Sequence, residues 1–124
     1  MTDTAALARA FVQTLDARDW DAWTALLDPE VVYLLPQTRE RISGRAAYLE
    51  FNQTYPGDWS LRPKVVIADA ERAVVWFEWS VGAERSEAQV FLEFGGDGLV
   101  TRVTDFWPES YDPPERMVDT VERY

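Results

Sequence analysis

A carboxylate lies among aromatic residues near the end of the chain. Asp105 falls in the segment "RVTDFWPES", residues 102 to 110, directly before Phe106 and Trp107. Burying a carboxylate among apolar side chains costs free energy unless it is paired or hydrogen-bonded. Asp105 is therefore either a working acid or base with a raised pKa, or a structural carboxylate that pairs with an arginine such as Arg45 or with a backbone amide.

The composition restricts the groups that could assist such a carboxylate. The 124 residues include no histidine and no cysteine, which removes the commonest general base, thiol catalysis and thiolate metal sites. Carboxylates, tyrosines, hydroxyls, arginines and one lysine remain. No Asp-rich calcium loop is present. A hard cation held by oxygen ligands is still compatible with these groups. We expect no cofactor and no metal site.

The net charge narrows the range of partners and compartments. Twelve basic and 22 acidic residues give a net charge of −10, which argues against nucleic acid or an anionic membrane as the main partner. No stretch of 18 apolar residues occurs, and the start "MTDTAALARAFV" lacks the basic region and long apolar core of a signal peptide. We expect a cytoplasmic protein that forms a single domain over residues 1–124.

The elements that must position these side chains follow from periodicity. Apolar residues at helical spacing predict helices over 4–17, over a shorter segment that ends at Pro29, and over 44–55. Alternating patterns and turn signals, including "GGDG" at 95–98, predict strands over 31–36, 59–68, 73–81, 84–94 and 99–107. A polar loop is expected after Pro36 and a short helix after Pro114. Strands joined by hairpins after a helical start predict an α+β fold with an antiparallel sheet.

The strand over 73–81 carries large apolar side chains on both faces. Alternation divides its side chains into two sets: Val75, Phe77, Trp79 and Val81 on one face, and Val74, Trp76, Glu78 and Ser80 on the other. A sheet with one solvated face would be polar along that face. We therefore expect one face to pack on the helices and the other on a second copy of the chain.

The chain resembles the NTF2-like superfamily and, within it, the SnoaL-like group. The resemblance covers nearly the whole chain and depends on three segments: "DARDWDAWTALLDPEVVYLLP", "ISGRAAYLEF" and "VTDFWPESYDPPERMVDTVERY". It implies a cone in which three N-terminal helices pack on a curved antiparallel sheet, a pocket in the mouth of the cone, and a homodimer through the outer sheet face. The superfamily contains isomerases, cyclases, dehydratases and epoxide hydrolases, as well as proteins without catalysis, so the fold alone assigns no function.

The resemblance also suggests roles for individual residues. Limonene-epoxide hydrolases carry an acid near the end of the last strand and a tyrosine on the first, and Asp105 and Tyr33 fall at similar positions. Their water-positioning residues correspond to Leu35, Glu78 and Ser80 here, so that mechanism is not expected. The same alignment places Glu78 inside the cone with Asp105. Such a pair could act as acid and base, with Tyr33 donating to a developing oxyanion.

Each of these residues also has a structural interpretation. Glu78 could face solvent or a dimer interface, and Tyr33 could simply pack on its strand. Several aromatic residues are expected to be either core or lining of the pocket: Trp23, Phe51, Tyr55, Trp59, Trp76 and Trp107.

The leading hypothesis is a SnoaL-like pocket protein that acts on a small hydrophobic molecule as an isomerase, dehydratase or cyclase through carboxylate chemistry. Asp105 would be the base, and Tyr33 or Glu78 would assist. The alternative is a binding or dimeric interaction module of the same fold without catalysis.

Overall fold

Three helices and six strands make up the fold. The computed structural model describes residues 2–124. The elements follow in the order α1 (Thr4–Asp16), α2 (Trp20–Thr24), β1 (Leu27–Leu35), β2 (Glu40–Ser43), α3 (Arg45–Thr54), β3 (Trp59–Ala68), β4 (Arg72–Val81), β5 (Glu84–Phe94) and β6 (Val100–Phe106). The predicted helical start and α+β class are confirmed.

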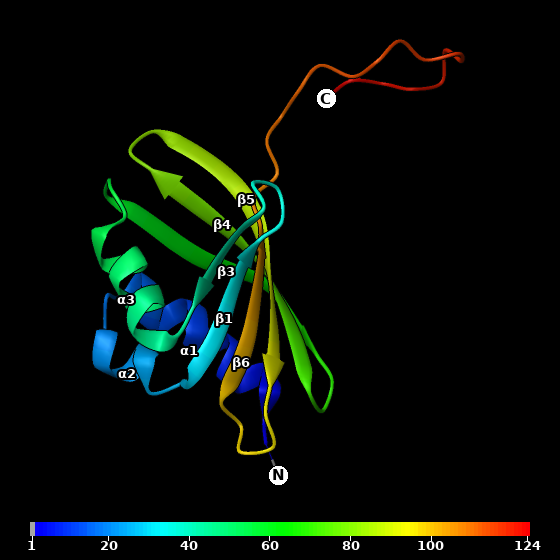
Figure 1. Ribbon diagram of the computed structural model, residues 1–124. Helices are drawn as coiled ribbons and strands as arrows, with labels where there is room; N and C mark the ends of the chain where they lie inside the picture. The colour runs from blue at the N-terminus through cyan, green and yellow to red at the C-terminus, as the bar shows by residue number, and fades with distance from the viewer. Residues whose placement is uncertain (1) are drawn as a thin grey trace.

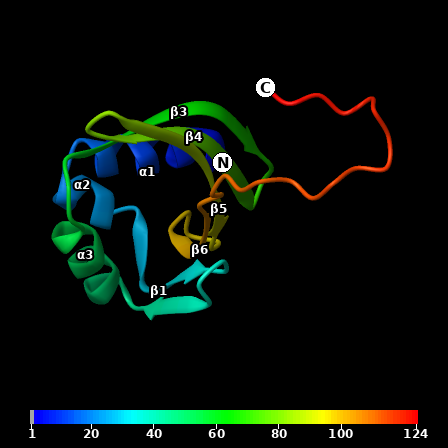
Figure 2. The ribbon, with the colours of Figure 1, turned by 90° about the horizontal axis from the view of Figure 1, so that it is seen from above.

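All six strands belong to one curved sheet with the order β2-β1-β6-β5-β4-β3. The sheet curls around the helices, so that β1 and β3 lie on opposite sides of them (Figures 1 and 2). Four of the five strand pairings are antiparallel, as predicted, whereas β1 and β6 run parallel. The polar loop expected after Pro36 is also shorter than predicted, because Glu40–Ser43 returns along β1 as an edge strand.

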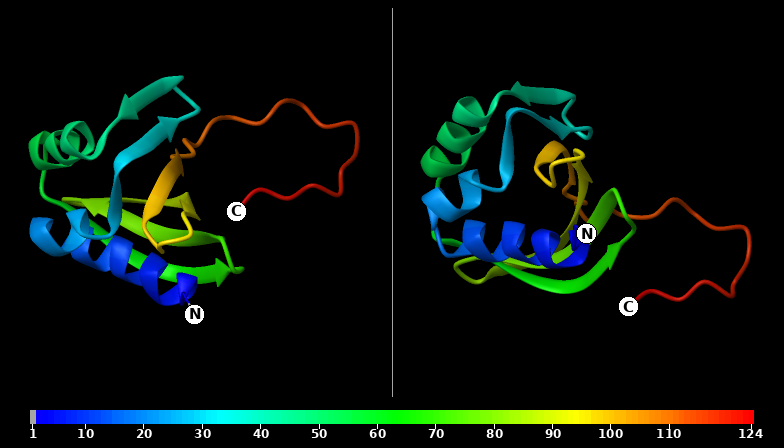
Figure 3. Two further views of the ribbon diagram at one scale, coloured as in Figure 1. Left: turned by 60° about the horizontal axis from the view of Figure 1, so that its bottom comes forward. Right: turned by 90° about the horizontal axis from the view of Figure 1, so that it is seen from below.

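The helices pack on the inner face of the sheet. The Asp3 carboxylate caps α1 by accepting from the amide of Ala6. α1 lies against β3 and β4 (Figure 3). Its buried apolar residues are Ala8, Phe11, Val12 and Leu15. This packing brings one side of every central strand toward the helices and leaves the other side outside.

β4 shows most clearly which side chains point each way. Ala73, Val75 and Phe77 are buried on the inner face, whereas Trp76 and Glu78 belong to the outer face. The pairing register extends this division to the neighbouring strands, where Asp105 lies opposite the inward Val90. In the following, the inner face is the one that contacts the helices, and the outer face is its reverse.

Beyond β6 the chain runs away from the body of the protein. Residues 108–124, here called the tail, extend on the side away from α3 (Figures 1 and 3). The short helix expected after Pro114 is absent from this described segment, which contains only a turn near residues 117–120. Along residues 2–124, none of the helices combines the length and apolarity needed to cross a membrane.

Candidate active site

A cavity of about 550 Å³ opens between the inner face of the sheet and the helices. That volume falls within the roughly 300–1,000 Å³ typical of small-molecule sites. Its wall is largely aromatic, with rings from Phe11, Tyr33, Tyr48, Phe51, Tyr55, Trp59, Phe77, Trp79 and Trp107. The site is therefore suited to an apolar molecule of modest size.

Asp105 and Tyr33 meet inside this cavity. They lie on the neighbouring strands β6 and β1, and the Tyr33 hydroxyl donates to Oδ2 of Asp105 over 2.7 Å. Only 8% of Asp105 is exposed, and it forms no ion pair with any described residue. The expected alternative partner Arg45 instead donates to the carbonyl of Leu27. The carboxylate is thus buried with one hydroxyl as its partner and without a cation.

Burial perturbs the Asp105 carboxyl strongly. Desolvation is the main cause and raises its pKa to about 6, while the polar groups of Tyr33 and Trp107 act in the opposite direction. Among the described residues, Oδ1 of Asp105 has no hydrogen-bond partner. One oxygen of the carboxylate is held by Tyr33, and the other is buried without a partner.

Two stacked tyrosines flank the carboxylate. The rings of Tyr33 and Tyr48 lie 4.5 Å apart at 19°, and both are almost fully buried. Burial and the nearby Asp105 charge raise the pKa of both phenols, so each remains protonated at neutral pH. Their hydroxyls can therefore act as hydrogen-bond donors but not as bases.

The polar groups of the cavity are few and carry no positive charge. Besides Asp105 and the tyrosines, its lining includes Gln37, Glu40, Asn52 and Glu109, but neither lysine nor arginine among the described residues. The side-chain oxygen of Gln37 accepts from the amide of Trp107 over 2.6 Å and so holds the end of β6 against the loop after β1. The site therefore offers no counter-ion to an anionic ligand.

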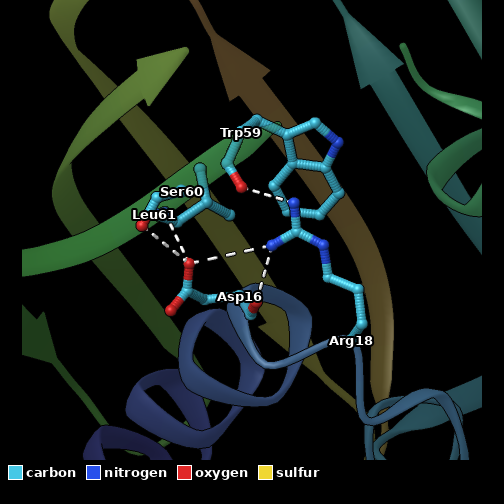
Figure 4. Close-up of polar contacts among 5 residues, drawn as sticks. All are labelled: Asp16, Arg18, Trp59, Ser60 and Leu61. Carbon is cyan, nitrogen blue, oxygen red and sulfur yellow. Dashed lines mark hydrogen bonds and ion pairs between the residues drawn. The ribbon is translucent and has the colours of Figure 1, made fainter. Parts of the chain in front are cut away.

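One aromatic ring of the lining is held by a polar cluster between α1 and β3. The Arg18 guanidinium stacks on the Trp59 ring, 3.3 Å from its centroid, and donates to the carbonyls of Asp16 and Trp59 (Figure 4). The Asp16 carboxylate accepts from Ser60 and from the amide of Leu61. Arg18 thus positions Trp59 without lining the cavity itself.

The cavity unites only some of the residues proposed from the sequence. Asp105, Tyr33, Phe51, Tyr55, Trp59 and Trp107 all line it. Trp23 does not: it is wholly buried and packs against Phe11 and Tyr48 as core. The assignment of Trp23 to the pocket was therefore wrong in position.

Glu78 and Trp76 lie on the outer face, so their expected places in the cone were also wrong. Glu78 pairs with Arg62 over 2.9 Å, and the Trp76 indole donates to Glu87 beneath Lys64. The physical reason is the two-residue period of a strand. An alignment that differs by one residue moves every side chain to the opposite face. No second carboxylate therefore accompanies Asp105 on β4.

Sequence reasoning missed Tyr48 and Trp79, although both had a signal. Tyr48 precedes Phe51 and Tyr55 by three and seven residues, which places all three on one side of α3. Trp79 shares the alternation of Val75 and Phe77 on the inner face. Neither pattern by itself distinguishes cavity lining from solid core, because that depends on how closely the helices approach the sheet.

Comparisons with known proteins identify the class to which this fold and site belong. The SnoaL-like domain model matches residues 8–108, and the chain therefore belongs to the SnoaL-like domain family. No curated protein shows significant similarity to the chain.

Solved structures show the same NTF2-like fold. A candidate ketosteroid isomerase from Kribbella flavida DSM 17836 is 53% identical, with a TM-score of 0.92 over 98% of this chain and 89% of that one. A candidate polyketide cyclase from Xanthomonas campestris pv. campestris is 26% identical, with a TM-score of 0.70 over 85% of this chain and 90% of that one. An NTF-2 like protein from Burkholderia xenovorans LB400 shares the fold at 20% identity, with a TM-score of 0.80 over 98% of this chain and 94% of that one.

Proposed function

We propose that this protein is a cofactor-free acid–base catalyst that moves a proton on a small, uncharged, largely apolar substrate. The observation that carries the proposal is the asymmetry of Asp105. Tyr33 holds Oδ2, while Oδ1 is buried in an aromatic cavity without a partner. A carboxylate with one free oxygen and no cation is arranged to accept a proton from a bound molecule.

The protonation state of Asp105 favours the role of base at neutral pH. With a pKa of about 6, roughly nine in ten of the carboxyls are ionised at pH 7. The same raised pKa makes Asp105 a much stronger base than an exposed aspartate, since base strength rises with pKa. Tyr33 orients the carboxylate and, because its hydroxyl is already engaged, is not free to donate to the substrate.

The reaction that fits best is the isomerisation of a β,γ-unsaturated ketone to its conjugated isomer. Oδ1 of Asp105 takes a proton from the carbon between the carbonyl and the double bond. The C–H electrons form a new carbon–carbon double bond, and the carbonyl π electrons move to the oxygen to give a dienolate. Asp105 then returns the proton to the γ-carbon, which restores the carbonyl. No oxidant or co-reactant is needed. The 53% identity to a candidate ketosteroid isomerase supports this choice of reaction.

The developing negative charge needs hydrogen-bond donors in the cavity. The Tyr48 hydroxyl is one candidate, and the second N–H of the Asn52 amide is another, since that amide already donates to the Tyr48 carbonyl with one N–H. The lack of lysine and arginine in the described lining favours a neutral ketone over a carboxylated one.

The experiment is a spectrophotometric assay with a β,γ-unsaturated ketosteroid, which gains ultraviolet absorbance when its double bond conjugates. We expect turnover whose kcat falls on the acid side with an apparent pKa near 6. The Asp105→Asn variant should lose about 100-fold or more, the scale of general base catalysis. The Glu78→Gln variant is the matched control, because its carboxylate lies on the outer face and should leave turnover unchanged.

Direct binding separates this proposal from a module that binds without catalysis. Calorimetry with a saturated ketosteroid measures binding in the wild-type protein and in Asp105→Asn. Turnover by the wild type supports catalysis. Binding without turnover of any tested enone supports the non-catalytic alternative, and unchanged turnover in Asp105→Asn rejects Asp105 as the base.

We also propose that the protein forms a homodimer through the outer face. Four large apolar side chains are exposed there on three adjacent strands: Val65, Ile67, Trp76 and Phe91. Contiguous exposed apolar side chains of this kind are typical of an interface. Light scattering after gel filtration at micromolar concentration should give about twice the chain mass of 14.3 kDa.

A further inference from the structure

The tail carries apolar side chains that its own protomer does not cover. Tyr111 and Met117 are 85% and 98% exposed, and Val118, Val121 and Tyr124 are also exposed. The segments around Tyr111 and Tyr124 enclose a hollow of about 430 Å³ that is lined only by tail residues. The tail projects from the end of β6 on the side of the sheet away from α3 (Figures 1 and 2). An extended segment with this composition needs a surface outside its own protomer to bury its apolar groups.

The tail falls within the part of the chain that matches a related protein. The match to the Kribbella flavida protein covers 98% of 124 residues at a TM-score of 0.92. A match of that extent leaves out about two or three residues, so it includes nearly all of the 17-residue tail. The tail is therefore aligned almost entirely with residues of a related protein whose structure was solved by crystallography.

The charge of the tail is opposite to that of the outer face. Residues 108–124 contain five acidic and two basic side chains. The outer face of β3 to β6 reverses that balance, with three glutamates against five cations: Arg62, Lys64, Arg72, Arg85 and Arg102. In a chain whose net charge is −10, an excess of positive charge on one face is a local exception.

Several of these cations are already engaged on their own sheet. Four of the five have a carboxylate partner: Arg62 pairs with Glu78, Lys64 with Glu87, Arg72 with Asp69 and Arg102 with Glu93. Arg85 forms no ion pair with any described residue. Arg85 lies opposite Ser80 in the β4–β5 hairpin, at one end of the exposed apolar side chains. Opposite charges around an apolar centre are the usual composition of a specific interface.

We propose that the tail of each protomer crosses to a second copy of this chain and packs on the outer face near Arg85. Seventeen extended residues reach at most about 55–60 Å, well beyond the roughly 30 Å width of a small domain. The tail buries its apolar side chains beside the exposed apolar residues of the partner's outer face, and its acidic residues face the cations of that face. This inference rests on the proposed outer-face dimer and is independent of the proposed catalysis.

Cross-linking between two single-cysteine variants tests the contact directly, because the chain has no cysteine of its own. The full-length Thr120→Cys variant, which labels the tail, is mixed with a larger tagged Ser80→Cys variant, which labels the outer face. A short bismaleimide then traps contacts between different protomers. The matched control replaces Ser80→Cys with Arg9→Cys, on the exposed side of α1. We expect cross-linked heterodimers with Ser80→Cys and about tenfold fewer with Arg9→Cys.

A second measurement tests the energetic contribution of the tail in the full chain. Sedimentation equilibrium compares the wild type with the variant Tyr111→Ser, Val118→Ser, Val121→Ser, and with Arg85→Glu against the matched Arg9→Glu. We expect the dimer dissociation constant to rise about tenfold or more in the first two variants and to stay unchanged in the last. Added salt should weaken the wild-type dimer, as it screens the tail charges.

The outcomes distinguish a failure of the proposed tail contact from a failure of the proposed outer-face dimer. A stable dimer with no cross-link to Ser80→Cys, or with an unchanged dissociation constant in the tail variant, overturns the proposed tail contact. It leaves the proposed outer-face dimer intact. A monomer at every concentration overturns both. Cross-linking within one chain, in a monomeric variant that carries both cysteines, would show that the tail folds onto its own sheet. That result would overturn the proposal that the tail crosses to a second copy.

Discussion

The buried carboxylate of Asp105 should reduce the stability of the fold at neutral pH, and Asp105→Asn should restore part of the loss. Its pKa rises from an ordinary value of 3.8 to about 6 on folding, mainly through burial. At about 1.36 kcal/mol for each pH unit, that difference corresponds to roughly 3 kcal/mol of destabilisation once the group is ionised. Asparagine has nearly the same shape and can still accept from Tyr33. We therefore expect Asp105→Asn to be about 1–3 kcal/mol more stable at pH 8.

The sign of the pH dependence follows from where the proton binds. Between pH 3.8 and about 6 the folded state holds the Asp105 proton and the unfolded state does not. The contribution of this group to stability therefore falls as pH rises through that interval, and it levels off above about 6. The advantage of Asp105→Asn should shrink as the pH drops from 7 toward 4.

The assay is urea unfolding of the two proteins at several pH values, with the free energy of unfolding taken as a difference at each pH. Taking the difference cancels the titration of the other carboxyls. The exposed Glu50→Gln on α3 is the control, and it should change stability by less than about 0.5 kcal/mol at any pH. If Asp105→Asn is less stable than the wild type at pH 8, the carboxylate is a stabilising structural acid and the reasoning fails.

Three further predictions concern the surroundings of Asp105. Tyr33→Phe removes the hydrogen bond that stabilises the carboxylate, so the pKa of Asp105 should rise by roughly one to two pH units, measured by carboxyl NMR and by the pH profile of kcat. Arg18→Ala frees the Trp59 ring and should weaken binding of a saturated ketosteroid about two- to fivefold in calorimetry, against no change in Arg9→Ala. A steroid carboxylate should bind about tenfold or more weakly than its methyl ester at pH 8, and equal affinities would contradict the uncharged-substrate inference.

Local patterns sufficed to predict most of the fold. Periodicity located the helices and five of the six strands, because their apolar residues repeat at 3.6 or 2 positions. The pairing of β1 with β6 is parallel and joins segments about 70 residues apart, as the Tyr33–Asp105 hydrogen bond shows. No local pattern carries such a contact. The edge strand β2 was missed since "ERIS" is short and mostly polar.

The sequence likewise predicted only part of the candidate site. Asp105 could be predicted from the sequence, because a carboxylate among aromatic residues is costly to bury, and it lies in the cavity. Glu78 was misplaced although the alternation of β4 had already grouped it with Trp76, away from Phe77. The alignment to distant relatives overrode a two-residue period that is fixed by backbone geometry. Where an alignment to distant relatives disagrees with the two-residue alternation of a strand, the alternation is the stronger argument for which face a side chain occupies.

The same burial that makes Asp105 costly also gives the cavity its chemistry. An exposed aspartate would cost nothing and would be a weak base; one paired with Arg45 would be stable but would lose its raised pKa. The single Tyr33 hydroxyl lies between these cases, because it orients one oxygen without supplying a charge. A sequence selected for stability alone would place an asparagine or an apolar residue at this point of β6. The carboxylate is therefore better explained by what the other oxygen does than by what it contributes to the fold.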